Sequence, residues 1–304
     1  MVDEAARAGH GRVSRRLVSD WADQGLLGDP RRTSRGVGGG RGARYEWSEA
    51  QCRLFLLLLE RRKTLPAMGG LGGLCDIPVG FWLYWAVDWI EIDQVQRALA
   101  TWWRRTSSTN EDTSLAQARK FVHSFVPKGA PREATNALRD ELQESMRRGR
   151  FDADKLKRLA SAALVRSGGR SKWMTQDPSG AIDAMLSTVT AMERYDEATP
   201  ADFLYARARL RRIAGDYVRL WDELHGRPGG EAFETPTWEF FTTNSCRHLI
   251  TGIGEQLRAQ RGGRRLPAVD LVPANTIPVE FTILPIREPI PMGDEPTTRG
   301  ATGG

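Results

Sequence analysis

The chain has 304 residues, of which 40% are hydrophobic and 27% are charged, and its formal net charge is +6 at pH 7. A chain of this length can bury a substantial core, and we expect two domains plus tails. Its most apolar stretch, residues 77–90, is shorter than the about 20 apolar residues that span a bilayer. The first sixteen residues also lack the apolar core of a signal peptide. We therefore expect a cytoplasmic protein without a membrane partner.

Cysteine and histidine residues are few. Cys52, Cys75 and Cys246 lie far apart in the sequence, and an odd number of widely spaced cysteines predicts buried thiols in a reducing compartment. The four histidines show neither the spacing of a zinc site nor that of a catalytic group. We therefore expect no metal, no cofactor and no enzymatic activity.

Residues 1–63 are expected to form an N-terminal domain. Residues 3–8 predict one or two helical turns. Residues 13–24 predict a longer helix, which Ser14 caps at its start and Gly25 ends. The apolar stripe of this helix consists of Leu17, Val18 and Trp21.

An arginine- and glycine-rich stretch follows at residues 31–44, with five arginines, five glycines and no acidic residue. Glycine lets a loop approach another backbone closely, and arginine is the side chain best suited to phosphate. Ser48 is then expected to cap a helix at 49–63. Its apolar run, Leu54 to Glu60, should pack beneath the first helices and against the segments that follow.

Positive charge is concentrated in this N-terminal part. Residues 1–63 contain 13 Lys and Arg against 8 Asp and Glu, a net charge of +5. The remaining residues contain 31 and 30, a net charge of +1. Such a distribution is typical of a nucleic-acid-binding module attached to a neutral body.

Residues 64–262 predict a helical body, expected to serve oligomerisation, effector sensing or partner binding. The glycines of 68–74 are expected to loosen the chain before an aromatic segment, in which Phe81, Trp82, Trp85 and Trp89 recur on one buried helical face. A helix is expected at 92–104, and a polar linker or exposed loop at 105–114. Further amphipathic helices are expected at about 115–126, 132–149, 152–166, 179–196, 200–225 and 234–260.

The last 42 residues, 263–304, hold seven of the sixteen prolines, which excludes long helices there. We expect a Pro-rich, largely disordered tail with one short strand at 279–283.

Two features of the body have both a functional and a structural interpretation. The tryptophan cluster at 82–103 is either an effector pocket or part of the core, and the core is favoured. Arg207, Arg209, Arg211 and Arg212 are either a second nucleic-acid contact or a solvated helical face with ion pairs, and the solvated face is favoured.

The order of the N-terminal elements predicts a winged helix-turn-helix within a mainly α-helical protein. In such a module the recognition helix reads base edges in the major groove, while the wing contacts phosphates or the minor groove. The candidate recognition-helix residues are Ser14, Arg15, Arg16 and Ser19, with Arg16 and Ser19 favoured for base contacts. The candidate wing residues are Arg31, Arg32, Arg35, Arg41 and Arg44.

Two patterns carry a family resemblance: Val13-Ser14-x-x-Leu17-Val18-x-x-Trp21-x-x-x-Gly25-Leu26-Leu27 and Tyr45-x-Trp47-Ser48-Glu49-Ala50-Gln51. Together they resemble MerR-like and excisionase-like winged helix-turn-helix proteins of actinobacterial plasmids and integrative elements. The resemblance covers about residues 3–63, and it implies that Arg16 and Ser19 face the major groove. The sequence departs from the family pattern in three ways. Asp20 and Trp21 occupy the two aromatic positions of the recognition helix, the first helix is short, and the long C-terminal dimerisation helix has no clear counterpart.

These observations favour a sequence-specific DNA-binding transcriptional regulator of a mobile element or plasmid. Its expected partners are double-stranded DNA and a second copy of the chain. One alternative is a DNA-bending accessory factor for excision, replication or partition, and another is a helical interaction protein with a degenerate DNA-binding module. For residues 31–44 themselves, a flexible surface segment and an RNA-binding segment remain alternatives, whereas a P-loop is disfavoured because no Lys-Ser/Thr follows the glycines.

Overall fold

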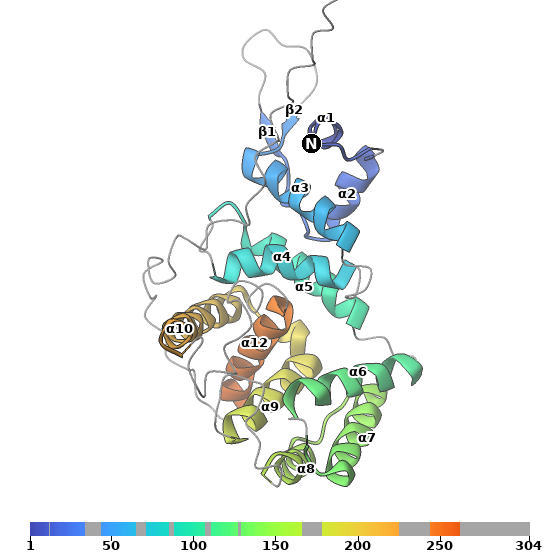
Figure 1. The fold of residues 1–304 in the computed structure, drawn as a ribbon, viewed down its shortest axis with the longest axis vertical. Helices are drawn as coiled ribbons and strands as arrows, with labels where there is room; N and C mark the ends of the chain where they lie inside the picture. The colour runs from blue at the N-terminus through green and yellow to red at the C-terminus, as the bar shows by residue number, and fades with distance from the viewer. Residues whose placement is uncertain are drawn as a thin grey trace, which may run out of the picture.

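The computed structural model describes residues 1–11, 13–33, 44–64, 71–84, 88–106, 111–126, 129–165, 178–224 and 244–261 (Figure 1). Within these residues the protein is mainly helical, as the sequence predicts, and it contains one two-stranded antiparallel sheet. None of the helices in this part of the chain combines the length and the apolar composition that a membrane span requires.

The chain begins with α1 (Val2–Arg7), α2 (Arg15–Asp23), β1 (Arg31–Thr33), β2 (Arg44–Glu46) and α3 (Glu49–Thr64). It continues with α4 (Leu71–Tyr84), α5 (Ile92–Thr106), α6 (Glu111–Phe125), α7 (Arg132–Arg148) and α8 (Ala153–Val165). The last described elements are α9 (Pro178–Arg194), the short 3-10 helix η2 (Tyr195–Glu197), α10 (Pro200–Leu224) and α12 (Ser245–Arg261). Figure 1 shows α1–α3 and the hairpin at one end of the molecule and α6–α8 at the other.

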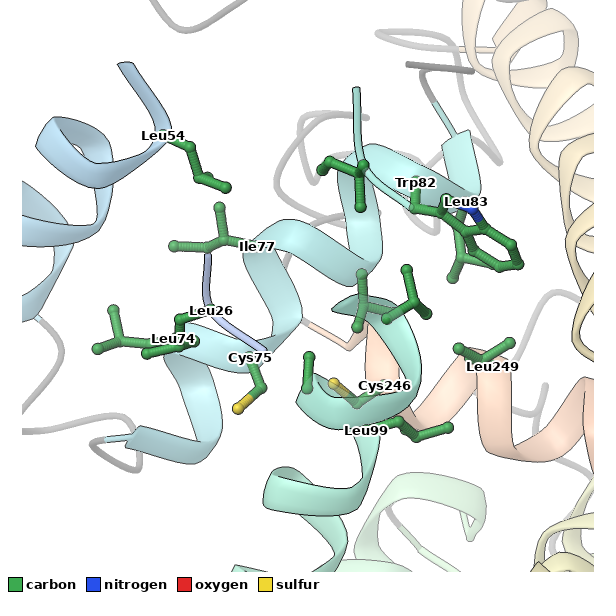
Figure 2. Packing of buried hydrophobic residues seen from close by; sticks show 14 of the residues in the cluster. Leu26, Leu54, Leu74, Cys75, Ile77, Trp82, Leu83, Leu99, Cys246 and Leu249 are labelled. Carbon is green, nitrogen blue, oxygen red and sulfur yellow. The ribbon is translucent and has the colours of Figure 1, made fainter. Parts of the chain in front are cut away.

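One hydrophobic cluster runs from the N-terminal helices into the body. It contains side chains of α1 to α5 together with side chains of α10 and α12. Leu54, Phe55 and Leu58 of α3 are buried in it, so the apolar run of this helix packs as the sequence predicts. Figure 2 shows Leu54 pointing toward Ile77 of α4. The predicted domain boundary between residues 63 and 64 falls at the end of α3, and α3 shares this cluster with α4.

Helix α12 occupies the centre of the body and packs against α9, α10 and α4. Its close approach to α9 depends on Gly254, where an added Cβ would lie 1.8 Å from the carbonyl oxygen of Ser187. A second hydrophobic cluster is built from α6, α7, α8 and α9, with Phe125, Leu142 and Leu156 among its most buried members. The four helices at this end thus bury a core of their own.

Helix α4 differs from the sequence-based expectation. The glycines of 68–74 were expected to loosen the chain, yet α4 begins at Leu71 and includes Gly72 and Gly73 as well as Pro78. Low helix propensity is overridden here because most of α4 is buried. The expected aromatic face is also wrong in part, since α4 ends at Tyr84 and Trp89 lies in the following turn. There the Trp89 ring contacts Phe81 at a centroid distance of 6.1 Å; Trp85 lies outside the described residues.

Two further expectations are corrected. The polar segment 105–114 was expected to be a linker, but α5 extends to Thr106 and α6 already begins at Glu111. The solvated face with ion pairs that was expected for the arginines of α10 is confirmed for two of them, since Arg212 is exposed and Arg209 pairs with Glu255. It is wrong for Arg207 and Arg211, which are half-buried against the end of α4. The proline-rich tail, with its expected strand at 279–283, lies outside the described residues, as do residues 234–243 of the last expected helix.

Candidate nucleic-acid interface

Helix α2 has one buried and one exposed face. Ser14 begins it as an N-cap in extended conformation, and its Oγ accepts a hydrogen bond from the backbone N–H of Leu17 at 3.1 Å. Val18 and Trp21 are buried on the inner side, where the Trp21 ring meets Phe55 of α3 edge to face at 5.4 Å. The polar side chains of the helix are left on the outer face.

Gly25 ends α2 in a way that only glycine allows. Its φ is +76°, and the N–H groups of Leu26 and Leu27 both bond the carbonyl of Trp21. An added Cβ at Gly25 would lie 2.1 Å from the backbone nitrogen of Ala98 in α5. The turn after α2 is therefore pressed directly against the backbone of the body.

A buried amide network holds the segment between α2 and the hairpin. The Gln51 side-chain oxygen accepts the N–H of Gly28 at 2.9 Å, and the Gln51 amide donates to the side-chain oxygen of Gln94 at 2.9 Å. The Gln94 amide in turn donates to the carbonyl of Leu26 at 3.3 Å. Beside this network, Arg97 binds both carboxylate oxygens of Asp29, at 3.1 and 3.2 Å. Helices α3 and α5 together fix the chain immediately before β1.

The hairpin pairs β1 and β2 antiparallel. Arg31 lies opposite Glu46, Arg32 opposite Tyr45, and Thr33 opposite Arg44. Arg31 is exposed. Of the other candidate wing residues, Arg32 and Arg44 lie in the paired strands, while Arg35 and Arg41 lie outside the described residues.

The four candidate residues of α2 differ in their surroundings. Ser14, Arg15, Arg16 and Ser19 are all exposed, although the Ser14 hydroxyl is engaged as the helix cap. Arg16 lies 3.8 Å from Asp20, and its side chain is 89% exposed. A surface ion pair of this kind contributes little and is easily exchanged for another anion. The outer face of α2 thus presents two arginines and one uncommitted serine to solvent.

Sequence reasoning gave no role to three residues that shape this region, although Tyr45 and Gln51 belong to the family pattern. Tyr45 of β2 is 61% exposed and pairs with Arg32 across the hairpin. Gln51 and Gln94 are buried positioning residues. Each glutamine occupies a polar position within an apolar helical stripe. This pattern could have indicated a buried amide, but it does not reveal the hydrogen-bond partner of that amide.

A second group of polar side chains lies buried between α4 and α12. Asp76 accepts the backbone N–H of Cys246 at 2.8 Å and thereby caps the start of α12, while Tyr84 and Nδ1 of His248 are joined by a 2.7 Å hydrogen bond. Burial raises the pKa of Asp76 to about 7 and lowers the pKa of His248 to about 3. Burial also raises the pKa of the Cys75 thiol to about 12, which opposes thiolate chemistry there. This group joins two helices, and among the described residues no cluster of His, Cys, Asp and Glu is arranged to hold a metal ion.

Comparisons of the chain with protein-family models, with curated proteins and with solved structures find no match.

Proposed function

We propose that the protein is a sequence-specific double-stranded DNA-binding protein, with residues 1–63 acting as a winged helix-turn-helix, and that it regulates transcription from a mobile element or plasmid. The observations that carry the proposal are the exposed polar face of α2 and the arginine-bearing hairpin that follows it in the chain, before α3. Arg15, Arg16 and Ser19 are the exposed side chains of this face that can reach base edges or phosphates. The regulatory role rests on the family resemblance of residues 3–63.

The arrangement of charge supports this role. A DNA-binding surface needs cations that are not neutralised by neighbouring acids, because counterion release from phosphates supplies most of the affinity. Arg15 and Arg31 are exposed, and the residues from 31 to 44 contain no acidic side chain, although Glu46 lies opposite Arg31 in the hairpin. The surface ion pair of Arg16 with Asp20 leaves its guanidinium available for exchange onto DNA.

The division of labour follows from these positions. The hairpin arginines contact phosphates and set affinity without reading sequence, whereas Arg16 and Ser19 select the bases. Tyr45 adds an exposed aromatic side chain at the base of the hairpin, placed to pack on the sugar-phosphate backbone. A second copy of the chain provides the second recognition helix for a two-fold symmetric site.

The test replaces Arg31, Arg32, Arg35, Arg41 and Arg44 with alanine and measures binding to genomic fragments at several salt concentrations. We expect a large loss of affinity, and a salt slope that flattens by about 0.9 for each lost phosphate contact. The matched control removes five exposed cations from the opposite end of the molecule: Arg119, Arg132, Arg150, Lys157 and Arg158. Equal affinity of the wing variant and the wild type would overturn the proposal.

The kind of site that is bound separates regulation from element processing. Genome-wide capture followed by footprinting should show protection of promoters. Protection of element ends or of a replication origin would instead indicate an accessory factor. Absence of any shifted duplex at about 50 mM salt, a condition that favours even non-specific complexes, would indicate an interaction protein.

A further inference from the structure

Two arginines of α10 lie half-buried beside one another at the end of α4. Arg207 and Arg211 are one helical turn apart, on the side of α10 that faces α4. Figure 2 shows Trp82 and Leu83, the residues that they contact, at the end of α4 away from Leu74. In Figure 1, α4 lies between α10 and the N-terminal helices, so these arginines are separate from the candidate nucleic-acid interface.

The structure holds both guanidinium groups in place. The Arg207 guanidinium carbon lies 4.6 Å from the centre of the Trp82 ring, which is a cation–π contact. Arg211 donates from Nε to the carbonyl of Leu83 at 2.8 Å and from Nη2 to the carbonyl of Trp82 at 3.4 Å. These are carbonyls of the last turn of α4, where the helix dipole favours a cation.

Neither guanidinium has a carboxylate partner among the described residues. The Nε of Arg207 is buried without a hydrogen-bond partner, although a guanidinium carries five N–H donors. Other cations of the same region are paired: Arg209 bonds Glu255, and Arg194 bonds Glu197. Among the described residues, Arg207 and Arg211 thus differ from Arg209 of the same helix in having no carboxylate partner.

The electrostatic cost of this arrangement is visible in both groups. Burial, together with the neighbouring charge of Arg207, lowers the pKa of Arg211 to about 10. Burial likewise lowers the pKa of Arg207, and the acid whose charge opposes both shifts is the exposed Asp88. An anion placed between the two groups would remove their repulsion and satisfy the free donors.

We propose that Arg207 and Arg211 form a binding site for the oxyanion group, phosphate or carboxylate, of a small molecule. Two fixed guanidinium groups match the planar, bidentate geometry that both oxyanions favour. The Trp82 ring orients Arg207, the carbonyls of α4 orient Arg211, and their remaining N–H donors bind the ligand. This site is independent of DNA binding and gives the helical body a ligand-binding function.

The experiment titrates the full-length protein with inorganic phosphate and, separately, with succinate, by calorimetry at constant ionic strength set with sodium chloride. We expect saturable binding of at least one of the two anions. Binding of phosphate alone identifies a phosphate ligand, binding of succinate alone identifies a carboxylate ligand, and binding of both identifies a general oxyanion site. Absence of saturable binding by either anion overturns the proposal.

Three variants locate the site. Arg207→Gln should weaken binding about tenfold or more, because a charged hydrogen-bond donor is lost. Arg207→Lys keeps the positive charge but loses the planar, bidentate donor geometry of the guanidinium, so it should bind the anion with intermediate affinity. This variant keeps the test decisive should the glutamine variant fail to fold. Arg212→Gln removes an exposed cation from the same helix and should bind as the wild type does. Unchanged binding by both Arg207 variants, or loss of binding in Arg212→Gln or in the wing variant, would place the anion elsewhere and overturn the proposal.

Discussion

The side-chain amide of Gln51 in α3 donates a hydrogen bond to the side-chain oxygen of Gln94 in α5 at 2.9 Å, in the interior between the N-terminal helices and the body. Each glutamine also bonds the backbone of the segment that joins α2 to the hairpin, Gln51 at Gly28 and Gln94 at Leu26. The position of the hairpin relative to α2 therefore depends on a helix that lies outside residues 1–63.

Gln94→Leu should lower the free energy of unfolding by about 1–3 kcal/mol, because the buried carbonyl of Leu26 and the amide of Gln51 each lose a partner. Urea denaturation followed by circular dichroism measures the effect. Gln96→Leu changes a half-buried glutamine of the same helix and should alter stability by less than about 0.5 kcal/mol. An equal loss of unfolding free energy in the two variants would show that the Gln51–Gln94 network does not stabilise the fold.

Two glycines with nearly the same backbone conformation provide a second comparison. Gly25 has φ +76° and Gly9 has φ +80°, but an added Cβ meets the backbone of α5 only at Gly25. Gly9→Ala should cost about 1–2 kcal/mol of stability, the strain of the left-handed conformation. Gly25→Ala should cost about 3–5 kcal/mol, since overpacking adds to the same strain. Thermal and chemical denaturation should rank the variants in this order, and a milder effect at Gly25 would contradict the packing against α5.

Substitution of two serines among the recognition-helix candidates should distinguish an effect on stability from an effect on DNA recognition. Ser14→Ala should lower stability by about 1 kcal/mol, because the first turn of α2 loses the acceptor for the N–H of Leu17. Ser19→Ala, on the exposed face, should leave stability unchanged and alter the base preference of DNA binding. Denaturation curves together with selection from random duplexes provide the two readouts. A Ser19 variant that keeps the wild-type base preference would remove this residue from the base-reading set.

The buried group between α4 and α12 makes a prediction about pH. His248 has a folded pKa of about 3 against an ordinary value of 6.5, so its contribution to stability is lost as the pH falls from about 6.5 toward 3. Asp76 has a folded pKa of about 7 against an ordinary value of 3.8, so its contribution is present at low pH and is lost as the pH rises toward 7. Between about pH 4 and 6.5 the two contributions have opposite slopes, and they offset one another in the wild type.

Asp76→Asn keeps an oxygen for the N–H of Cys246 but removes the titrating group. The stability of this variant, measured by urea denaturation from pH 4.5 to 7.5, should gain on the wild type as the pH rises, by up to about 1.4 kcal/mol per pH unit. His248→Gln should show the reverse, with its largest relative stability at the acidic end. Curves that run parallel to the wild type across this range would mean that neither group titrates as its burial requires.

The sequence predicted the structure correctly where a feature depends on residues that are close together in the chain. Ser14 and Gly25 bound α2 as expected, because a cap and a left-handed turn involve groups only a few residues apart. The prediction of a loose segment at Gly72 and Gly73 was wrong because burial against distant helices, which no local pattern reveals, keeps this segment helical. The prediction that Arg207 and Arg211 are solvated was wrong because a run of charged residues does not reveal which side of α10 packs against Trp82. The partner of Gln51 is 43 residues away, and no local pattern indicates it.

The fit of Gly25 against Ala98 has a consequence for anyone who wishes to move the N-terminal unit into another protein. A fragment cut at residue 63 would leave behind the helix surface on which the α2 turn rests, and it would expose leucines that α4 and α5 normally cover. A chimera that carries residues 1–106 keeps α4 and α5 and should stay in solution. We expect the fragment of residues 1–63 to precipitate. For this chain, the smallest portable piece is set by the helices that support the turn after α2 and not by where the charged stretch ends.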